Sequence, residues 1–149
     1  RVEALDEFFA YLQTSLNKIG VPISADVFGL TTWQEDDLNI GQILEHIAPH
    51  FDYVAPMVYP SHYPSSFQGF SNPAAHPYEI ISTAMKRAVF RLEQIEENPK
   101  KLRPWLQDFD LGATYDAAMI QKQIKAVEDA GLDSWMMWDP SNRYTREAY

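Results

Sequence analysis

The chain has 149 residues, of which 46% are hydrophobic and 22% charged, a balance typical of one folded globular domain and unlike disordered or collagen-like sequences. The 12 Lys and Arg residues face 21 Asp and Glu, so a formal net charge of −9 leaves no basic surface for nucleic acid or an anionic membrane. Cysteine is absent, which excludes disulfide scaffolds, thiolate zinc sites and cysteine nucleophiles, and no apolar run approaches the roughly 18 residues of a membrane helix.

The first third of the chain predicts a helix, a strand and a short second helix. Apolar residues recur at three- and four-residue steps over residues 2–19, the spacing of an amphipathic helix, and a glycine follows as its stop. Residues 23–28 form a short β-rich run between a proline and a glycine, which predicts a strand. Asp36 or Asp37 is a candidate cap for a helix over residues 40–47.

The middle of the chain predicts a buried strand, a long loop and a long helix. Residues 52–59 are apolar on both parities, as in a parallel sheet covered on both faces, although Pro56 cannot donate to the strand ladder. A Pro- and Ser-rich loop over residues 60–76 follows. An apolar stripe over residues 77–95, opened by a proline, then predicts a helix.

The last third predicts two more strands around one helix. Residues 103–109 and 134–138 are read as strands, and Asp116 as the N-cap of a helix that ends at Gly131. Residues 142–149 are only the beginning of a further element. Alternating strands and helices indicate right-handed βαβ units, an α/β fold and a parallel sheet. Because the chain starts inside a helical pattern without an initiator Met, we expect a piece of something longer.

Polar and aromatic side chains gather where the predicted strands end, which is where parallel α/β sheets bind ligands. Aromatic rings next to carboxylates and amides suit a sugar, whose ring faces stack on aromatics while its hydroxyls need hydrogen-bond partners. The residues at these strand ends are Asp26, Phe28, Met57, Tyr59, Gln107, Asp108, Asp110, Trp138 and Asp139.

Asp26 is the sharpest of these candidates. A carboxylate within an apolar strand loses hydration when it is buried, which costs free energy unless the carboxylate is paired or serves in a functional site. It is therefore either a ligand-binding or acid/base group, or a buried carboxylate held by loop amides or by an Arg of a neighbouring strand. The acidic run at residues 35–37 could join a sugar site, but capping and solvation explain it better.

The alternation of a strand decides between Gln107 and Asp108. If Trp105 and Gln107 face the site, Asp108 is a pairing or capping residue, and we favour Gln107. Trp138, followed by Asp139 and a proline, is either an indole floor under a ligand or a core tryptophan.

The long loop over residues 60–76, which carries His62, is either the wall of a cleft or a proline-stiffened excursion. His62 and His76 have no helical or strand relation, and His46 and His50 are read as surface histidines, so we predict no metal site and no cofactor. No glycine-rich phosphate loop, G-x-S-x-G elbow or HExxH motif occurs.

Five segments together closely resemble a family of bacterial and archaeal proteins that was first described as a domain of unknown function and is predicted to contain glycoside hydrolases. The match covers nearly the whole chain and keeps the motif order. The segments are ADVFGLTTW, IAPHFDYVAPMVYPSHY, NPAAHPYE, RPWLQDFDLG and DAGLDSWMMWDPSNRYT.

This resemblance implies a (β/α)8 TIM barrel, distantly similar to family 18 chitinases, in which Met57, Tyr59 and Trp138 line a sugar subsite. The four predicted strands are then strands five to eight, and residues 1–149 are the C-terminal half of a barrel without its N-terminal half. The acidic fourth-strand motif that supplies the general acid in such barrels is absent here.

We therefore predict part of a glycoside hydrolase that acts on a polysaccharide or cell-envelope glycan and is inactive in isolation. Asp26 is its predicted catalytic residue, as a supporting or second carboxylate. Met57, Tyr59, His62, Gln107, Asp108, Trp138 and Asp139 are the predicted substrate-binding residues. The expected partners are an oligo- or polysaccharide and either the N-terminal half or a second copy, but not nucleic acid or a membrane. For the parent protein, an extracytoplasmic or cell-envelope location is favoured.

Two alternatives stay open. The first is a carbohydrate-binding barrel without catalysis, and the second is an open flavodoxin-like sheet that binds a small phosphate ligand. The absence of a glycine-rich or Ser/Thr-rich first loop argues against the second.

Overall fold

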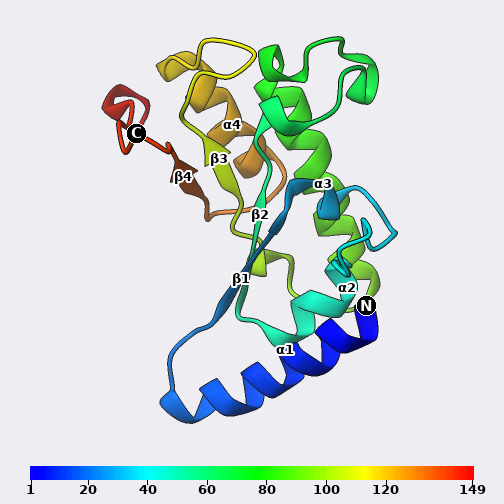
Figure 1. Cartoon of the computed structure of the whole chain (residues 1–149). Coiled ribbons are helices and arrows are strands. Elements are labelled where there is room, and N and C mark those ends of the chain that lie inside the picture. The colour runs from blue at the N-terminus through cyan, green and yellow to red at the C-terminus, as the bar shows by residue number, and fades with distance from the viewer.

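A computed structural model describes residues 1–149 as an α/β unit built on one four-stranded parallel sheet (Figure 1). The α/β prediction is therefore confirmed. No helix is long and apolar enough to cross a membrane. The helices and strands, in chain order, are α1 (Val2–Leu16), β1 (Ser24–Phe28), α2 (Leu44–Ile47), β2 (Tyr53–Met57), α3 (Pro77–Gln94), β3 (Trp105–Gln107), α4 (Ala117–Asp129) and β4 (Met136–Trp138).

The strands lie side by side in the order in which they occur in the chain. β1 pairs with β2 over five residues, from Ser24 opposite Tyr53 to Phe28 opposite Met57. β3 follows β2, and β4 follows β3, all parallel. This order contains no reversal of the kind that makes the ligand crevice of a flavodoxin-type sheet. Both β1 and β4 are edge strands.

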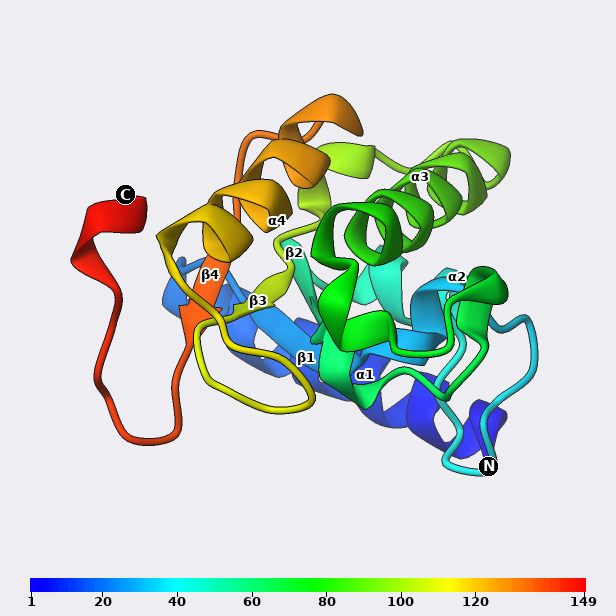
Figure 2. The ribbon, with the colours of Figure 1, turned by 90° about the horizontal axis from the view of Figure 1, so that it is seen from above.

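Helices α3 and α4 cover one face of the sheet, and α1 lies at the end where the strands begin (Figures 1 and 2). The core lies between the sheet and these two helices, with Val27, Val54 and Leu106 packed among the buried residues of α3. The opposite face of β1 is uncovered: Ser24, Asp26 and Phe28 are exposed, whereas Val27 between them is buried. The sheet therefore has one covered and one open face.

The predicted helix over residues 40–47 is wrong in its first half, because only Leu44–Ile47 is α-helical. Gly41, inside the predicted span, has a φ of +85°, a left-handed conformation that interrupts a right-handed helix. Asp37 caps no helix, since its carboxylate pairs with Arg1 at 2.9 Å.

Two other helices match their patterns more closely. The apolar stripe of α3 is buried from Ile81 to Leu92, and only Ile95, beyond the helix end, is 37% exposed. Asp116 caps α4 as predicted, because its Oδ1 accepts a hydrogen bond from the backbone N–H of Met119 at 3.0 Å. The stop at Gly131 has a φ of +82°.

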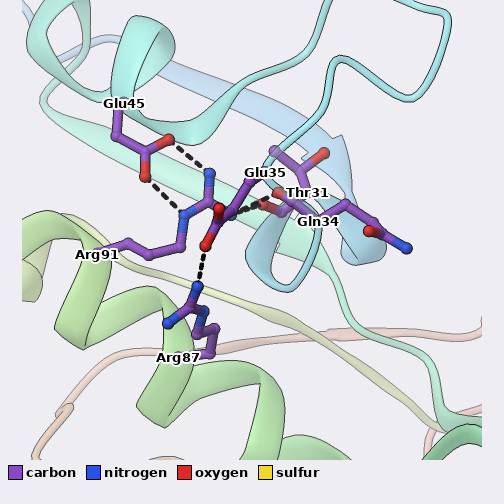
Figure 3. Close-up of polar contacts among 6 residues, drawn as sticks. All are labelled: Thr31, Gln34, Glu35, Glu45, Arg87 and Arg91. Carbon is purple, nitrogen blue, oxygen red and sulfur yellow. Dashed lines mark hydrogen bonds and ion pairs between the residues drawn. The ribbon is translucent and has the colours of Figure 1, made fainter.

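A buried cation joins α3 to the loop after β1 (Figure 3). Arg91, which is 3% exposed, donates to both carboxylate oxygens of Glu45 and to the backbone oxygens of Thr31 and Gln34. One turn earlier on α3, Arg87 pairs with Glu35 at the surface. These contacts hold the segment that begins with Gly29 against the helix layer, where it forms one side of the candidate site.

Candidate functional site

Side chains on the open sheet face form a first hollow, which we call the sheet-face cavity. It has a volume of about 260 Å³ and lies toward the carboxyl ends of the strands. Register places its residues next to one another, since Met57 pairs with Trp105 and Trp138 with Gln107. Its lining residues are Asp26, Met57, Tyr59, Trp105 and Trp138.

Asp26 is oriented in this cavity by an indole. The Trp105 Nε1–H donates a hydrogen bond to Asp26 Oδ1 at 2.9 Å, and Oδ2 has no partner in the chain. The ring of Trp105 meets that of Trp138 edge-to-face, with centroids 6.1 Å apart. Trp138 is 42% exposed and is therefore no core tryptophan. The cavity thus combines two indole surfaces with a free carboxylate oxygen.

Of the two interpretations of Asp26, the buried carboxylate is wrong. Its side chain lies on the open face of β1 and is exposed, while Ala25 and Val27 point to the helix layer. Its partner is an indole N–H, neither a loop amide nor an arginine. The apolar sequence neighbours of Asp26 gave no information about its burial, because they lie on the other face of the strand.

Tyr59 also lines the sheet-face cavity. Burial first, and then the negative charge of Asp26, raise the pKa of its hydroxyl to about 12. The phenol therefore stays protonated at neutral pH and remains able to donate a hydrogen bond.

A second hollow, the loop cavity, adjoins the first and shares Met57 and Tyr59 with it. Its volume is about 310 Å³, and five of its seven lining residues are hydrophobic. Those seven are Phe28, Gly29, Leu30, Met57, Tyr59, His62 and Tyr63.

Buried contacts fix the walls of the loop cavity. The hydroxyl of Tyr63 donates to the Gly29 carbonyl at 3.4 Å, and its ring lies 4.7 Å from that of Phe67. Gly29 approaches the β2 backbone so closely that a Cβ there would stand 2.3 Å from the Met57 carbonyl oxygen. The loop after β2 is therefore a wall of a hollow, the first of the two roles considered for it.

Gln107 shares the strand face of Trp105 but lies beneath the surface, 0% exposed. Its Oε1 accepts from the backbone N–H and hydroxyl of Ser61, and its Nε2 donates to the Phe109 carbonyl. The backbone of Gln107 exchanges two hydrogen bonds with the Gln123 side chain of α4. In this structure its carboxamide holds the loop after β2 to β3 and lines neither cavity.

Asp108 and Asp139 line a separate hollow of about 450 Å³ beside the C-terminal segment. Asp108 accepts hydrogen bonds from the backbone N–H and hydroxyl of Thr145 and from the hydroxyl of Tyr149. The Asp139 carboxylate accepts two backbone N–H groups, those of Ser141 and Arg143. Both carboxylates are thus occupied in shaping the chain after β4.

Two of the four histidines, His46 and His50, lie near the same carboxylate, and His62 lies elsewhere. His62 contacts the Tyr59 ring edge-to-face at 5.1 Å, and His50 Nε2 lies 2.8 Å from Asp6 Oδ1 on α1. His46 is 3.9 Å from the same oxygen. The chain contains no group of three or more His, Cys, Asp and Glu side chains arranged to hold a metal ion.

Trp105 was not among the predicted site residues, although it was expected to share a strand face with Gln107. Its signal was the two-residue spacing from Gln107, which places both side chains on one strand face. Its hydrogen bond to Asp26 joins residues 79 apart in the chain and reaches from β3 across β2 to β1, so only the tertiary structure reveals it.

Comparison with known families gives one match that covers most of the chain. The model of a family described as "Putative glycosyl hydrolase domain" matches residues 1–144. No curated protein matches the chain.

Proposed function

Because the chain belongs to the family described as "Putative glycosyl hydrolase domain", we propose that it binds an oligo- or polysaccharide in the sheet-face cavity. One observation carries this proposal: Trp105 and Trp138 flank a carboxylate whose Oδ2 is free, in a cavity open to solvent. Indole rings offer faces for a sugar ring, while Asp26 Oδ2 accepts from a hydroxyl and Tyr59 donates to one.

The sheet belongs, in this proposal, to one side of a (β/α)8 barrel. Supporting this are the consecutive parallel strand order, the helices on one face and the uncovered opposite face. Two unpaired edges, on β1 and β4, are what a closed barrel would pair. We infer that four further strands complete it, supplied by another segment or by a second copy of this chain.

Hydrolysis of a glycosidic bond needs two carboxyl groups, about 5–5.5 Å apart for retention or roughly 6.5–9.5 Å for inversion. Asp26 is the one carboxylate of the sheet-face cavity. Asp108 and Asp139 are engaged elsewhere, so the chain presents one member of such a pair. Asp26 would serve as nucleophile or supporting base only where a completed barrel brings the second carboxyl group. By itself the chain would bind glycan without cleaving it.

A binding titration tests the proposal. Soluble oligosaccharides of glucose, xylose and N-acetylglucosamine are added to ¹⁵N-labelled protein, and the indole N–H resonances of Trp105 and Trp138 are followed. We expect saturable shifts of both indoles with at least one sugar, and no release of reducing ends. Unmoved indole resonances with every sugar would contradict the proposal.

Asp26→Asn is the decisive variant, because losing a charge-assisted hydrogen bond of about 1.5–3 kcal/mol weakens binding roughly tenfold or more. Glu7→Gln removes one negative charge from an exposed position on α1 and is the matched control. Equal affinity of the two variants would remove Asp26 from the site.

A further inference from the structure

The loop cavity has no role in the proposal above, although it opens beside the sheet-face cavity. Met57 and Tyr59 belong to the lining of both, so a ligand seated over Trp105 and Trp138 would have the loop cavity next to it. Whatever a bound sugar carries on that side would enter it.

The chemistry of the two cavities differs. The sheet-face cavity holds the carboxylate of Asp26, whereas the loop cavity contains no carboxylate and no Lys or Arg. The hydroxyl of Tyr63 is already used by the Gly29 carbonyl, so His62 and Tyr59 are the polar side chains left to a ligand. A second sugar ring there would leave most of its hydroxyls without partners, which costs binding free energy.

The cavity is also formed before any ligand arrives. Tyr63 is 6% exposed and packs on Phe67, which in turn meets Trp33 edge-to-face at 5.6 Å. Gly29 is buried against the β2 backbone. A preformed apolar hollow gains affinity from an apolar guest without a further cost of ordering its walls.

We propose that the loop cavity binds an apolar substituent, an alkyl or aryl group attached to the sugar that occupies the sheet-face cavity. The ligands favoured by this site are therefore glycosides with an apolar aglycone or an apolar side group, rather than unsubstituted glycans alone. The claim that the apolar group is attached to a sugar rests on the proposed sugar site, but binding of an apolar group in the loop cavity can be tested without any sugar.

The first measurement uses 1-hexanol and protein labelled with ¹³C at the methyl groups of Met and Leu. We expect saturable shifts of the Met57 and Leu30 methyl resonances, and no shift for Leu111, which is 49% exposed and lies outside the cavity. Methyl resonances of Met57 and Leu30 that stay unmoved, or that move no more than those of Leu111, would overturn the inference.

The second measurement compares methyl, butyl and hexyl β-glucosides and β-galactosides by calorimetry. Each methylene that enters the cavity should improve the affinity about fourfold. Affinity that does not change with chain length, while the sugar still shifts the Trp105 indole, would refute the apolar pocket and keep the sugar site. Hexanol binding without any sugar binding would refute the sugar site and keep the apolar pocket.

Two variants locate the effect. Leu30→Asn places an amide in the wall and should abolish the gain with chain length, while Leu111→Asn should leave that gain intact. Because Leu30 also packs against the core, Phe28→Ser serves as the second variant, since Phe28 is 56% exposed and its loss endangers folding less. A chain-length gain that survives Phe28→Ser and Leu30→Asn in folded protein would contradict the assignment.

Discussion

Replacing the buried Arg91 of α3 by Met should destabilise the fold more than replacing the partly exposed Arg87 of the same helix. Arg91 is 3% exposed, and its Nε donates a hydrogen bond to Glu45 Oε1 at 2.6 Å. Its Nη1 donates to the backbone carbonyl oxygens of Thr31 at 2.6 Å and Gln34 at 2.7 Å. Methionine keeps most of the apolar stem but none of these donors.

The size of the effect follows from what is left behind. Removing one partner of a buried ion pair costs about 3–5 kcal/mol, because the other charge and its acceptors stay unpaired. The Glu45 side chain is 29% exposed, so water partly solvates the orphaned carboxylate. We therefore expect the lower end of that range, about 3 kcal/mol, which lowers the Tm of a chain of this size by roughly 6–12 °C.

Chemical denaturation followed by circular dichroism measures this difference, and Arg87→Met is its control. Arg87 lies one turn away on the same helix and pairs with Glu35, whose side chain is 74% exposed. Such a surface pair contributes at most about 1 kcal/mol. A free energy of unfolding for Arg91→Met equal to that of Arg87→Met would refute the reasoning that burial gives the Arg91 contacts their weight.

The same pair carries a pH signature. Burial is the largest single influence and raises the pKa of Glu45, but the hydrogen bonds from Arg91 and a backbone N–H, together with the charges of Arg91 and His46, outweigh it and hold that pKa below its usual value. A carboxyl whose pKa is lower in the folded state stabilises the fold above its unfolded pKa of about 4.3 and loses this contribution as the pH falls through the folded value. The stability gap between the parent chain and Arg91→Met should therefore shrink below about pH 4. A gap that widens on acidification would contradict this sign.

Three further outcomes are expected. Asp26→Asn removes the charge that helps to raise the pKa of Tyr59 to about 12, so an ultraviolet titration should show a lower value; an unchanged one would mean that burial alone sets it. Gly29→Ala pushes a Cβ into the Met57 carbonyl and should lower the Tm by several degrees, whereas a neutral result would show that the β1 and β2 backbones separate easily. Asp116→Ala removes the cap of α4 and should cost about 1 kcal/mol in denaturant unfolding; no loss would deny the cap its role.

The helices predicted best from the sequence are those that are defined by the residues of a single segment. The stripe of α3 and the cap of α4 need only their own residues, since side-chain spacing and one carboxylate define them. The predicted helix over residues 40–47 was wrong in its first half, because its apolar spacing is helical while its backbone is left-handed at Gly41. Apolar spacing does not report such a turn.

The candidate site shows the same division. That strand-end residues meet at one edge follows from parallel topology alone, and Asp26, Met57, Tyr59 and Trp138 do line one cavity. Strand alternation separated Gln107 from Asp108, which is a pairing residue as expected. It could not predict that the Gln107 carboxamide is buried, because its partner Ser61 lies 46 residues away in the chain.

The α/β class, the alternation of strands and helices and the residue types at the strand ends could all be predicted from the sequence, because local spacing and composition encode them. Tertiary structure alone decided which face of β1 stays open, and therefore that Asp26 is exposed and held by Trp105. It also decided that the cation in the α3 stripe finds Glu45. Burial and pairing depend on what the rest of the chain places opposite a residue, and no segment contains that information alone.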